Sequence, residues 1–226
     1  VSQDFSKNIS LLNLEVREEQ ESFAKEVGLL LKDEPVSLIQ APTGIGKTYG
    51  YLLPALSQAK ERQIVLSVPT KILQNQIMEE EGKRLKEVFH IDIHSLKGPH
   101  NYLKLDAFYR SLQENDENRL FRRFKMQLLV WLTETETGDL DEIGQLYRYQ
   151  HFLKDLRHDG NLSSQSLFVT EDFWKRSQER AQTCKLLVTN HAYLVTRLED
   201  NPEFVSDRLL IIDEEQRVGV KHKETL

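Results

Sequence analysis

The chain has one cysteine, Cys184, among its 226 residues. A lone cysteine cannot form an internal disulfide. It also leaves too few thiolates for an iron–sulfur cluster or a four-cysteine zinc site. Because cysteine-poor chains without disulfides are typical of reducing compartments, we expect this protein in the cytoplasm.

Long apolar runs and an excess of basic charge are also missing. No run approaches the ~20 apolar residues that a membrane-spanning helix needs, so we expect no membrane association. The formal net charge is −6, which provides no overall attraction to nucleic acid. A local basic groove would still permit DNA binding, because the local field matters more than the total charge.

The most informative motif that is present covers residues 41–48, which read Ala-Pro-Thr-Gly-Ile-Gly-Lys-Thr. A short apolar run, residues 36–39, precedes it, and residues 49–56 can begin a helix. A strand, a glycine-containing loop, Lys-Thr and a helix form the arrangement that grips a nucleoside triphosphate. The alternative is an ordinary glycine-containing turn between a strand and a helix.

Each part of this loop has an expected task. The backbone amides would form an anion site, and the helix N-terminus adds positive potential. Lys47 would reach the β- and γ-phosphates, and the Thr48 hydroxyl would ligate Mg²⁺. Ala41 stands where the usual pattern has glycine.

A second constellation lies near the end of the sequence, where the apolar run 209–212 is followed by Asp213 and Glu214. Nucleotide hydrolysis needs one acid that holds Mg²⁺ and another that orients or deprotonates the attacking water. We assign these roles to Asp213 and Glu214. Because ligands lie at the carboxyl ends of parallel strands, Asp213 and residues 41–48, called the phosphate loop from here on, would share one edge of a sheet. Taken alone, a strand that ends in two acids is a surface turn about as often as it is a functional site.

The hydrophobic pattern predicts an α/β fold with a parallel sheet covered by helices on both faces. The expected strands are residues 36–39, 63–68, 91–96, 185–189 and 208–212, and the expected helices include 16–31, 71–89 and one that starts at Lys47. Between residues 98 and 183 helical spacing dominates. We therefore expect a helical insert, 98–183, within a domain formed by 1–97 and 184–226. A helix in the insert would be capped by Asn115 or Asp116.

Six segments, in this order, resemble the first motor domain of superfamily 2 DNA helicases, and most closely the DinG branch of the XPD-like group. They are 16–20, 41–48, 68–76, 96–103, 187–194 and 213–216. The resemblance implies a RecA-like P-loop fold, with ATP and Mg²⁺ as cofactors. It implies single-stranded DNA and a second motor domain as partners of a monomer.

The same resemblance implies roles for individual residues. The nucleotide contacts are Arg17 and Gln20 at adenine, and Ala41, Thr43, Gly44, Gly46, Lys47 and Thr48 at the phosphates. Lys47 and Glu214 are the catalytic residues, and Thr48 and Asp213 are the Mg²⁺ ligands. Thr70, Gln74 and Asn190 would contact DNA. Thr70 would alternatively cap a helix, and Asn190 and His191 would alternatively brace the Asp213 segment.

The chain departs from the family at two places. Lys104 stands where the family's iron–sulfur domain has its first cysteine, and the insert has no cysteine elsewhere. We expect the insert to keep the position of that domain without a cluster. This pattern resembles the cluster-free DinG-like proteins of Gram-positive bacteria, many of which carry an exonuclease domain. Glu215 and Gln216 replace the Ala and His of the family's DEAH-type box.

The leading hypothesis is an ATP-dependent DNA helicase motor fragment that engages single-stranded DNA. Without the second motor domain and its arginine finger, the fragment is expected to bind ATP weakly and to hydrolyse little. One alternative is an ATP-gated DNA-binding module of a nuclease-linked protein that does not unwind DNA. Another is that the helical insert docks a partner protein.

Overall fold

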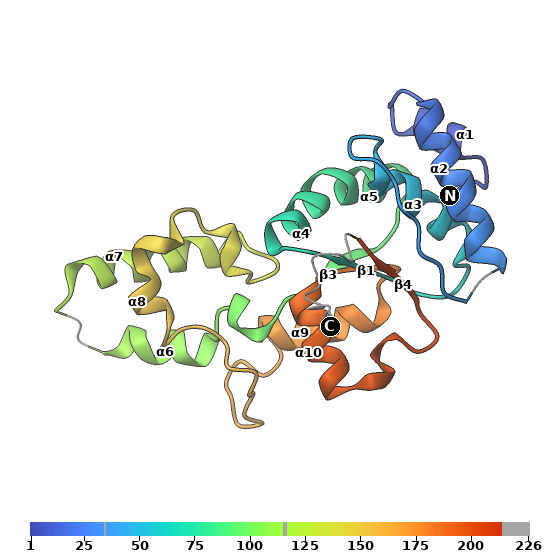
Figure 1. The fold of residues 1–226 in the computed structure, drawn as a ribbon. Coiled ribbons are helices and arrows are strands. Elements are labelled where there is room, and N and C mark those ends of the chain that lie inside the picture. The colour runs from blue at the N-terminus through green and yellow to red at the C-terminus, as the bar shows by residue number, and fades with distance from the viewer. Residues whose placement is uncertain (34, 115–116, 214–226) are drawn as a thin grey trace, which may run out of the picture. The chain divides into compact units, whose positions relative to one another are not determined.

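A computed structural model describes residues 1–33, 35–114 and 117–213 (Figure 1). The chain divides into two compact units. The first consists of Val1–Ser95 together with the segment that starts at Thr183, and the second is Leu96–Gln182. Each unit has its own apolar core.

The first unit is built on a parallel sheet. Its described strands are β1 (Ile64–Val68), β2 (Ile93–Ser95), β3 (Leu186–Asn190) and β4 (Leu209–Ile212). They lie in the order β2-β3-β1-β4, and every pair of neighbours is parallel. All residues of β1 and β3 are buried, as expected for the centre of a sheet covered on both faces. The prediction of an α/β fold with a parallel sheet is confirmed.

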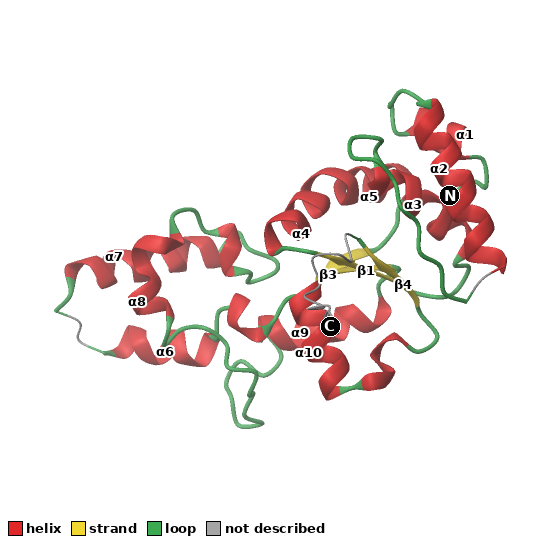
Figure 2. Ribbon diagram, in the orientation of Figure 1, coloured by secondary structure: helices red, strands yellow, loops and turns green. Residues whose placement is uncertain are grey.

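Helices cover this sheet. The first unit contains α1 (Phe5–Leu11), α2 (Glu18–Asp33), α3 (Lys47–Gln58), α4 (Lys71–Ile77), α5 (Lys83–Phe89) and α10 (His191–Asp200). A π-helical turn, Met78–Gly82, joins α4 to α5. Figure 2 shows α4 and α5 on one side of the strands and α10 on the other. Leu52 and Leu53 of α3 pack with Ile64 and Leu66 of β1 in the core.

The predicted strand over residues 36–39 is wrong. The structure describes this segment as loop, with the side chains of Val36 and Leu38 87% and 84% exposed. Strand β4 is an edge of the described sheet and is only partly buried. A short apolar run indicates strand propensity, but a strand forms only where a neighbour offers free backbone groups and a covered face. Residues 36–39 lack that covering in the described structure.

The second unit is helical. It contains α6 (Leu105–Gln113), α7 (Arg119–Leu132), α8 (Gln150–Leu153) and most of α9 (Phe173–Thr183). Its core includes Phe124, which stacks on Tyr149 with ring centroids 4.2 Å apart. Helix α7 is capped by Asn118, whose side chain accepts from the N–H groups of Leu120 and Phe121. The predicted caps at 115 and 116 lie outside the described residues. Over the described ranges, no helix is both long and apolar enough to cross a bilayer.

Candidate nucleotide site

The phosphate loop leads directly into α3, which begins at Lys47. Gly44 and Gly46 have φ angles of 84° and 81°, in the left-handed region that favours glycine. Gly46 is the N-cap of α3 and brings no side chain to cap the first turn. The first N–H groups of a helix have no partner within the helix, so they stay available to an anion.

The start of α2 holds this loop in place. Gln20 is 6% exposed, and its Nε2 donates to the carbonyl oxygen of Gly46 over 2.8 Å. Arg17 Nη1 donates to the carbonyl oxygen of Gly44 over 3.4 Å. A Cβ atom at position 46 would lie 2.3 Å from Gln20 Nε2, so a side chain there would force the Gln20 amide to move, in addition to the strain of the positive φ. Both residues predicted to reach adenine therefore lie against the phosphate loop.

The first turn of α3 lies beside Asp213. Lys47 and Thr48 are partly buried in that turn, and Tyr51 follows one turn later. The Tyr51 hydroxyl donates to Asp213 Oδ2 over 2.9 Å. Burial raises the pKa of Tyr51 well above its ordinary value, the Asp213 carboxylate raises it further, and a hydrogen bond with Thr48 acts in the opposite direction. The structure thus brings Thr48, Tyr51 and Asp213 together.

The backbone of Asp213 is held from two further directions. Its N–H donates to the carbonyl oxygen of Ser67 over 2.9 Å. Its carbonyl oxygen lies 2.8 Å from His191 Nε2. Asp213 is therefore placed by β1, α3 and α10 together. Glu214, the predicted second acid, lies outside the described residues, as do Glu215 and Gln216.

The three residues predicted to contact DNA differ in exposure. Thr70 is exposed and caps α4 by accepting the Leu73 N–H over 3.1 Å. Gln74 is fully buried, and its amide donates to Ser95 Oγ and to the Val188 carbonyl oxygen, each over 3.0 Å. These contacts tie α4 to the sheet, a position that fits bracing better than a direct contact with DNA.

Asn190 is also buried, at 7% exposure. Its side chain donates to Gln74 Oε1 over 3.0 Å and accepts the Tyr193 N–H over 3.0 Å, which caps α10. Of the three predicted DNA contacts, Thr70 alone has an exposed side chain in this structure. The buried pair forms a link between α4 and the start of α10.

Sequence reasoning missed two members of the site. Tyr51 lies three residues after Thr48, a spacing that puts both on one face of α3. That spacing could have identified Tyr51 as a member of the site. Ser67 is a polar residue in an otherwise apolar strand, which is a weaker signal. Its importance depends on His191 and Asp213, two residues distant in sequence.

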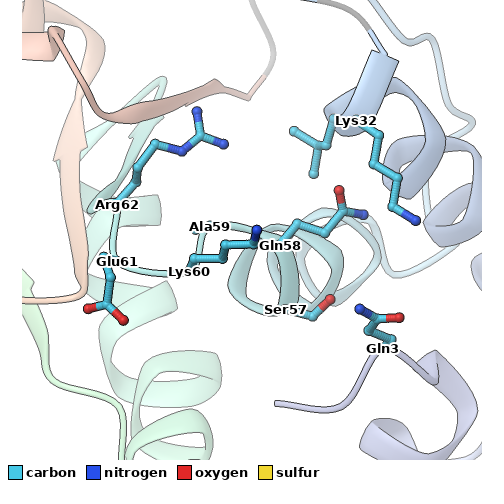
Figure 3. Close-up of a pocket in the computed structure, with 9 residues that line it drawn as sticks. Gln3, Lys32, Ser57, Gln58, Ala59, Lys60, Glu61 and Arg62 are labelled. Atoms are coloured by element: carbon cyan, nitrogen blue, oxygen red, sulfur yellow. The ribbon is translucent and has the colours of Figure 1, made fainter.

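A hollow of about 690 Å³ lies at the other end of α3 (Figure 3). Its lining includes Lys32, Ser57, Gln58, Lys60 and Arg62. Since the helix rises ~1.5 Å per residue, this end is about 18 Å from the phosphate loop. The hollow is therefore separate from the candidate nucleotide site.

Known proteins resemble this chain over ranges that include the phosphate loop. The model of the DEAD/DEAH box helicase family matches residues 19–133, a range that includes the phosphate loop. The chain is 34% identical over 206 residues to the protein named 3′-5′ exonuclease DinG of Bacillus subtilis (strain 168), covering 85% of this chain and 22% of that protein. It is 31% identical over 220 residues to the protein of the same name from Staphylococcus epidermidis, covering 95% and 24% respectively.

The chain therefore spans less than a quarter of the length of these relatives. The identities extend over most of the chain and confirm the resemblance to DinG proteins that the sequence motifs indicated. The family model independently covers half of the chain, from the start of α2 through the phosphate loop to the end of α7. This match shows that the chain belongs to the DEAD/DEAH box helicase family.

Proposed function

We propose that this chain forms the ATP-binding part of the first motor domain of a DinG-like, ATP-dependent DNA helicase. The observation that carries the proposal is the hydrogen bond between Tyr51 and Asp213. It places the carboxylate beside the first turn of α3, the turn that the phosphate loop enters. A triphosphate on the loop would therefore lie next to an acid at the end of a parallel strand, where such sheets bind ligands.

The residues present suit ATP and Mg²⁺. The left-handed glycines and the uncapped start of α3 suit phosphate oxygens. Thr48 and Asp213 offer the oxygen ligands that Mg²⁺ prefers. When bound, Mg²⁺ would supply charge neutralisation at the phosphates. Lys47 would bind the β- and γ-phosphates, and Glu214 would orient the attacking water.

The proposal also includes contacts with the adenine base and with single-stranded DNA. Gln20 and Arg17 lie against the loop and would meet adenine at its edge. Thr70, exposed at the start of α4, would donate to a phosphate of single-stranded DNA, a common use of such hydroxyls. A second motor domain would complete the ATP site, and the protein would act as a monomer.

We propose that residues 98–183 form an insert without an iron–sulfur cluster. In support, Lys104 Nζ forms an ion pair with Asp159 Oδ1 over 2.7 Å at the position where the family's first cluster cysteine stands. A cationic side chain engaged in this way offers no ligand to iron. The insert would then act on DNA or on a partner through its helices.

The test of the nucleotide site is the variant Lys47→Ala, made in the full chain. A fluorescent ATP analogue should bind at least tenfold more weakly to this variant, because the cation that faces the phosphates is lost. Lys60→Ala, at the far end of α3, is the matched control and should stay within twofold of the parent. Equal affinity of Lys47→Ala and the parent would overturn the proposal.

A second candidate is an ATP-gated DNA-binding module that does not unwind. The relatives' name, 3′-5′ exonuclease DinG, favours it, since a nuclease needs no strand separation on single strands. Strand displacement and ATP-dependent DNA binding, measured on the complete protein, distinguish the two. Displacement that requires ATP supports the helicase, whereas ATP-dependent binding without displacement supports the module.

A further inference from the structure

His191 joins two strands at the candidate nucleotide site. It is 6% exposed at the start of α10. Its Nδ1 lies 2.7 Å from Ser67 Oγ on β1, and its Nε2 lies 2.8 Å from the carbonyl oxygen of Asp213. One ring therefore spans from the central strand to the residue that follows β4.

The partners of the ring assign its hydrogens. A carbonyl oxygen only accepts, so Nε2 carries hydrogen and donates to Asp213. In the neutral ring Nδ1 then accepts, and the Ser67 hydroxyl donates to it. Ser67 also accepts the Asp213 N–H at its own carbonyl oxygen. Ser67, His191 and Asp213 thus form a closed ring of contacts.

The imidazole of His191 is held in place through Asn190, the preceding residue. Asn190 caps α10 and donates to Gln74, whose amide reaches β3 and Ser95. The backbone that carries His191 is therefore anchored to α4 and to the sheet. Because the anchors lie on three different elements, the imidazole has little freedom to move away from Asp213.

We infer that His191 is a positioning residue that fixes the backbone of Asp213, and through it the direction of the carboxylate toward α3, where it meets the Tyr51 hydroxyl. The inference rests on the proposed function, in which Asp213 is a Mg²⁺ ligand. Tyr51 restrains the carboxylate itself. His191 restrains the peptide group from which that side chain extends, so each residue controls a different part of Asp213.

Two substitutions separate the two contacts of the ring. His191→Gln keeps an N–H donor at the distance of Nε2 and loses the contact with Ser67. His191→Asn keeps an acceptor at the distance of Nδ1 and loses the contact with Asp213. His100→Asn, an exposed histidine in the second unit, is the matched control.

Amide hydrogen exchange of the full chain without nucleotide tests the placement directly. His191→Asn should speed exchange of the Asp213 N–H at least tenfold, and His191→Gln should leave it within threefold of the parent. Equal exchange in the parent and in His191→Asn, or equal acceleration in both variants, would overturn the inference. This outcome does not depend on nucleotide binding.

Affinity for a fluorescent ADP analogue, measured with Mg²⁺ and with EDTA, tests the functional consequence. His191→Asn should keep the affinity in EDTA within twofold and lose most of the gain that Mg²⁺ gives. A general structural defect would lower both affinities together, and that result would overturn the positioning role. A parent protein that binds no nucleotide would instead overturn the proposed function.

Discussion

The hydroxyl of Tyr51 donates a 2.9 Å hydrogen bond to Asp213 Oδ2. The two residues are far apart in sequence, and the contact joins the helix that follows the phosphate loop to the end of strand β4. Asp213 therefore lies at the same edge of the sheet as the loop. Every proposed contact to triphosphate and Mg²⁺ depends on that adjacency.

Tyr51→Phe should destabilise the first unit, because it removes a donor to a partly buried carboxylate while keeping the ring. Hydrogen bonds to charged groups contribute about 1.5–3 kcal/mol, and we expect a loss of that order in the free energy of unfolding. Urea denaturation measures it. Tyr109→Phe, at a ring 41% exposed in the second unit, should change stability by less than about 0.5 kcal/mol. Equal effects of the two variants would argue against the Tyr51 contact.

Gly44→Ala and Gly46→Ala form a matched pair in the phosphate loop. Both positions have left-handed φ angles, so each alanine should cost about 1–2 kcal/mol of folding free energy. A Cβ atom at position 44 would meet no other atom within 4 Å, whereas one at position 46 would lie 2.3 Å from Gln20 Nε2. Thermal denaturation should therefore show the larger loss for Gly46→Ala.

Gln20→Ala should remove the difference between these two glycine variants. With the Gln20 amide gone, Gly46→Ala retains only the cost of its φ angle. Measured by the same denaturation, the added cost of Gly46→Ala in a Gln20→Ala background should match that of Gly44→Ala. A persistent excess would mean that Gln20 is not what excludes a side chain at position 46.

The sequence predicted the features that depend on local pattern. Continuous apolar runs located the four described strands to within about two residues. The helix that starts at Lys47 and the strand that ends just before Asp213 lie where the sequence predicted them. Thr70 is a helix cap, one of the two readings that its sequence position allowed. These features are recognisable because short-range chemistry determines them.

The features that sequence missed depend on long-range pairing. Residues 36–39 have the composition of a strand, yet they are loop. Composition alone does not determine whether a segment pairs with an edge of the sheet. Gln74 has the position of a DNA contact in its motif, yet its amide is buried against β3. Its burial follows from packing between elements distant in sequence, which no local pattern reports.

The ion pair between Lys104 and Asp159 predicts a pH dependence. The Lys104 hydrogen bond lowers the pKa of Asp159 from 3.8 to about 2. The stabilisation from this pair is therefore complete above the unfolded-state pKa and is lost as pH falls through the folded-state value. In Lys104→Met, NMR titration should show the Asp159 pKa raised toward 3.8, with the Asn161 N–H still lowering it. A pKa that stays near 2 would assign the shift to another group.

Lys97 is a buried cation in the second unit. It is 1% exposed and forms ion pairs with Asp139 over 2.5 Å and with Asp141 over 2.9 Å. Lys97→Met leaves these partly exposed carboxylates without their cation, which should cost about 1–3 kcal/mol of unfolding free energy. Burial already raises the pKa of Asp139, and Lys97 opposes that shift. The variant should therefore recover stability as pH falls and Asp139 gains a proton.

The double variant Lys97→Met with Asp139→Asn is the control for that prediction. It removes the charge of one of the two carboxylates that Lys97 contacts and should be more stable than Lys97→Met alone. Urea denaturation at neutral pH compares the two. If the double variant were not the more stable, the charge of Asp139 would not be the source of the cost of Lys97→Met.

The convergence of the phosphate loop and Asp213 on one nucleotide–metal pocket is tested most directly with Mn²⁺–ADP and NMR of the full chain. Paramagnetic Mn²⁺ should broaden the amide signals of Gly44, Thr48 and Asp213 together, and leave those of Lys60 and Arg62 at the far end of α3 sharp. Broadening of the loop signals with Asp213 unaffected would contradict the shared pocket.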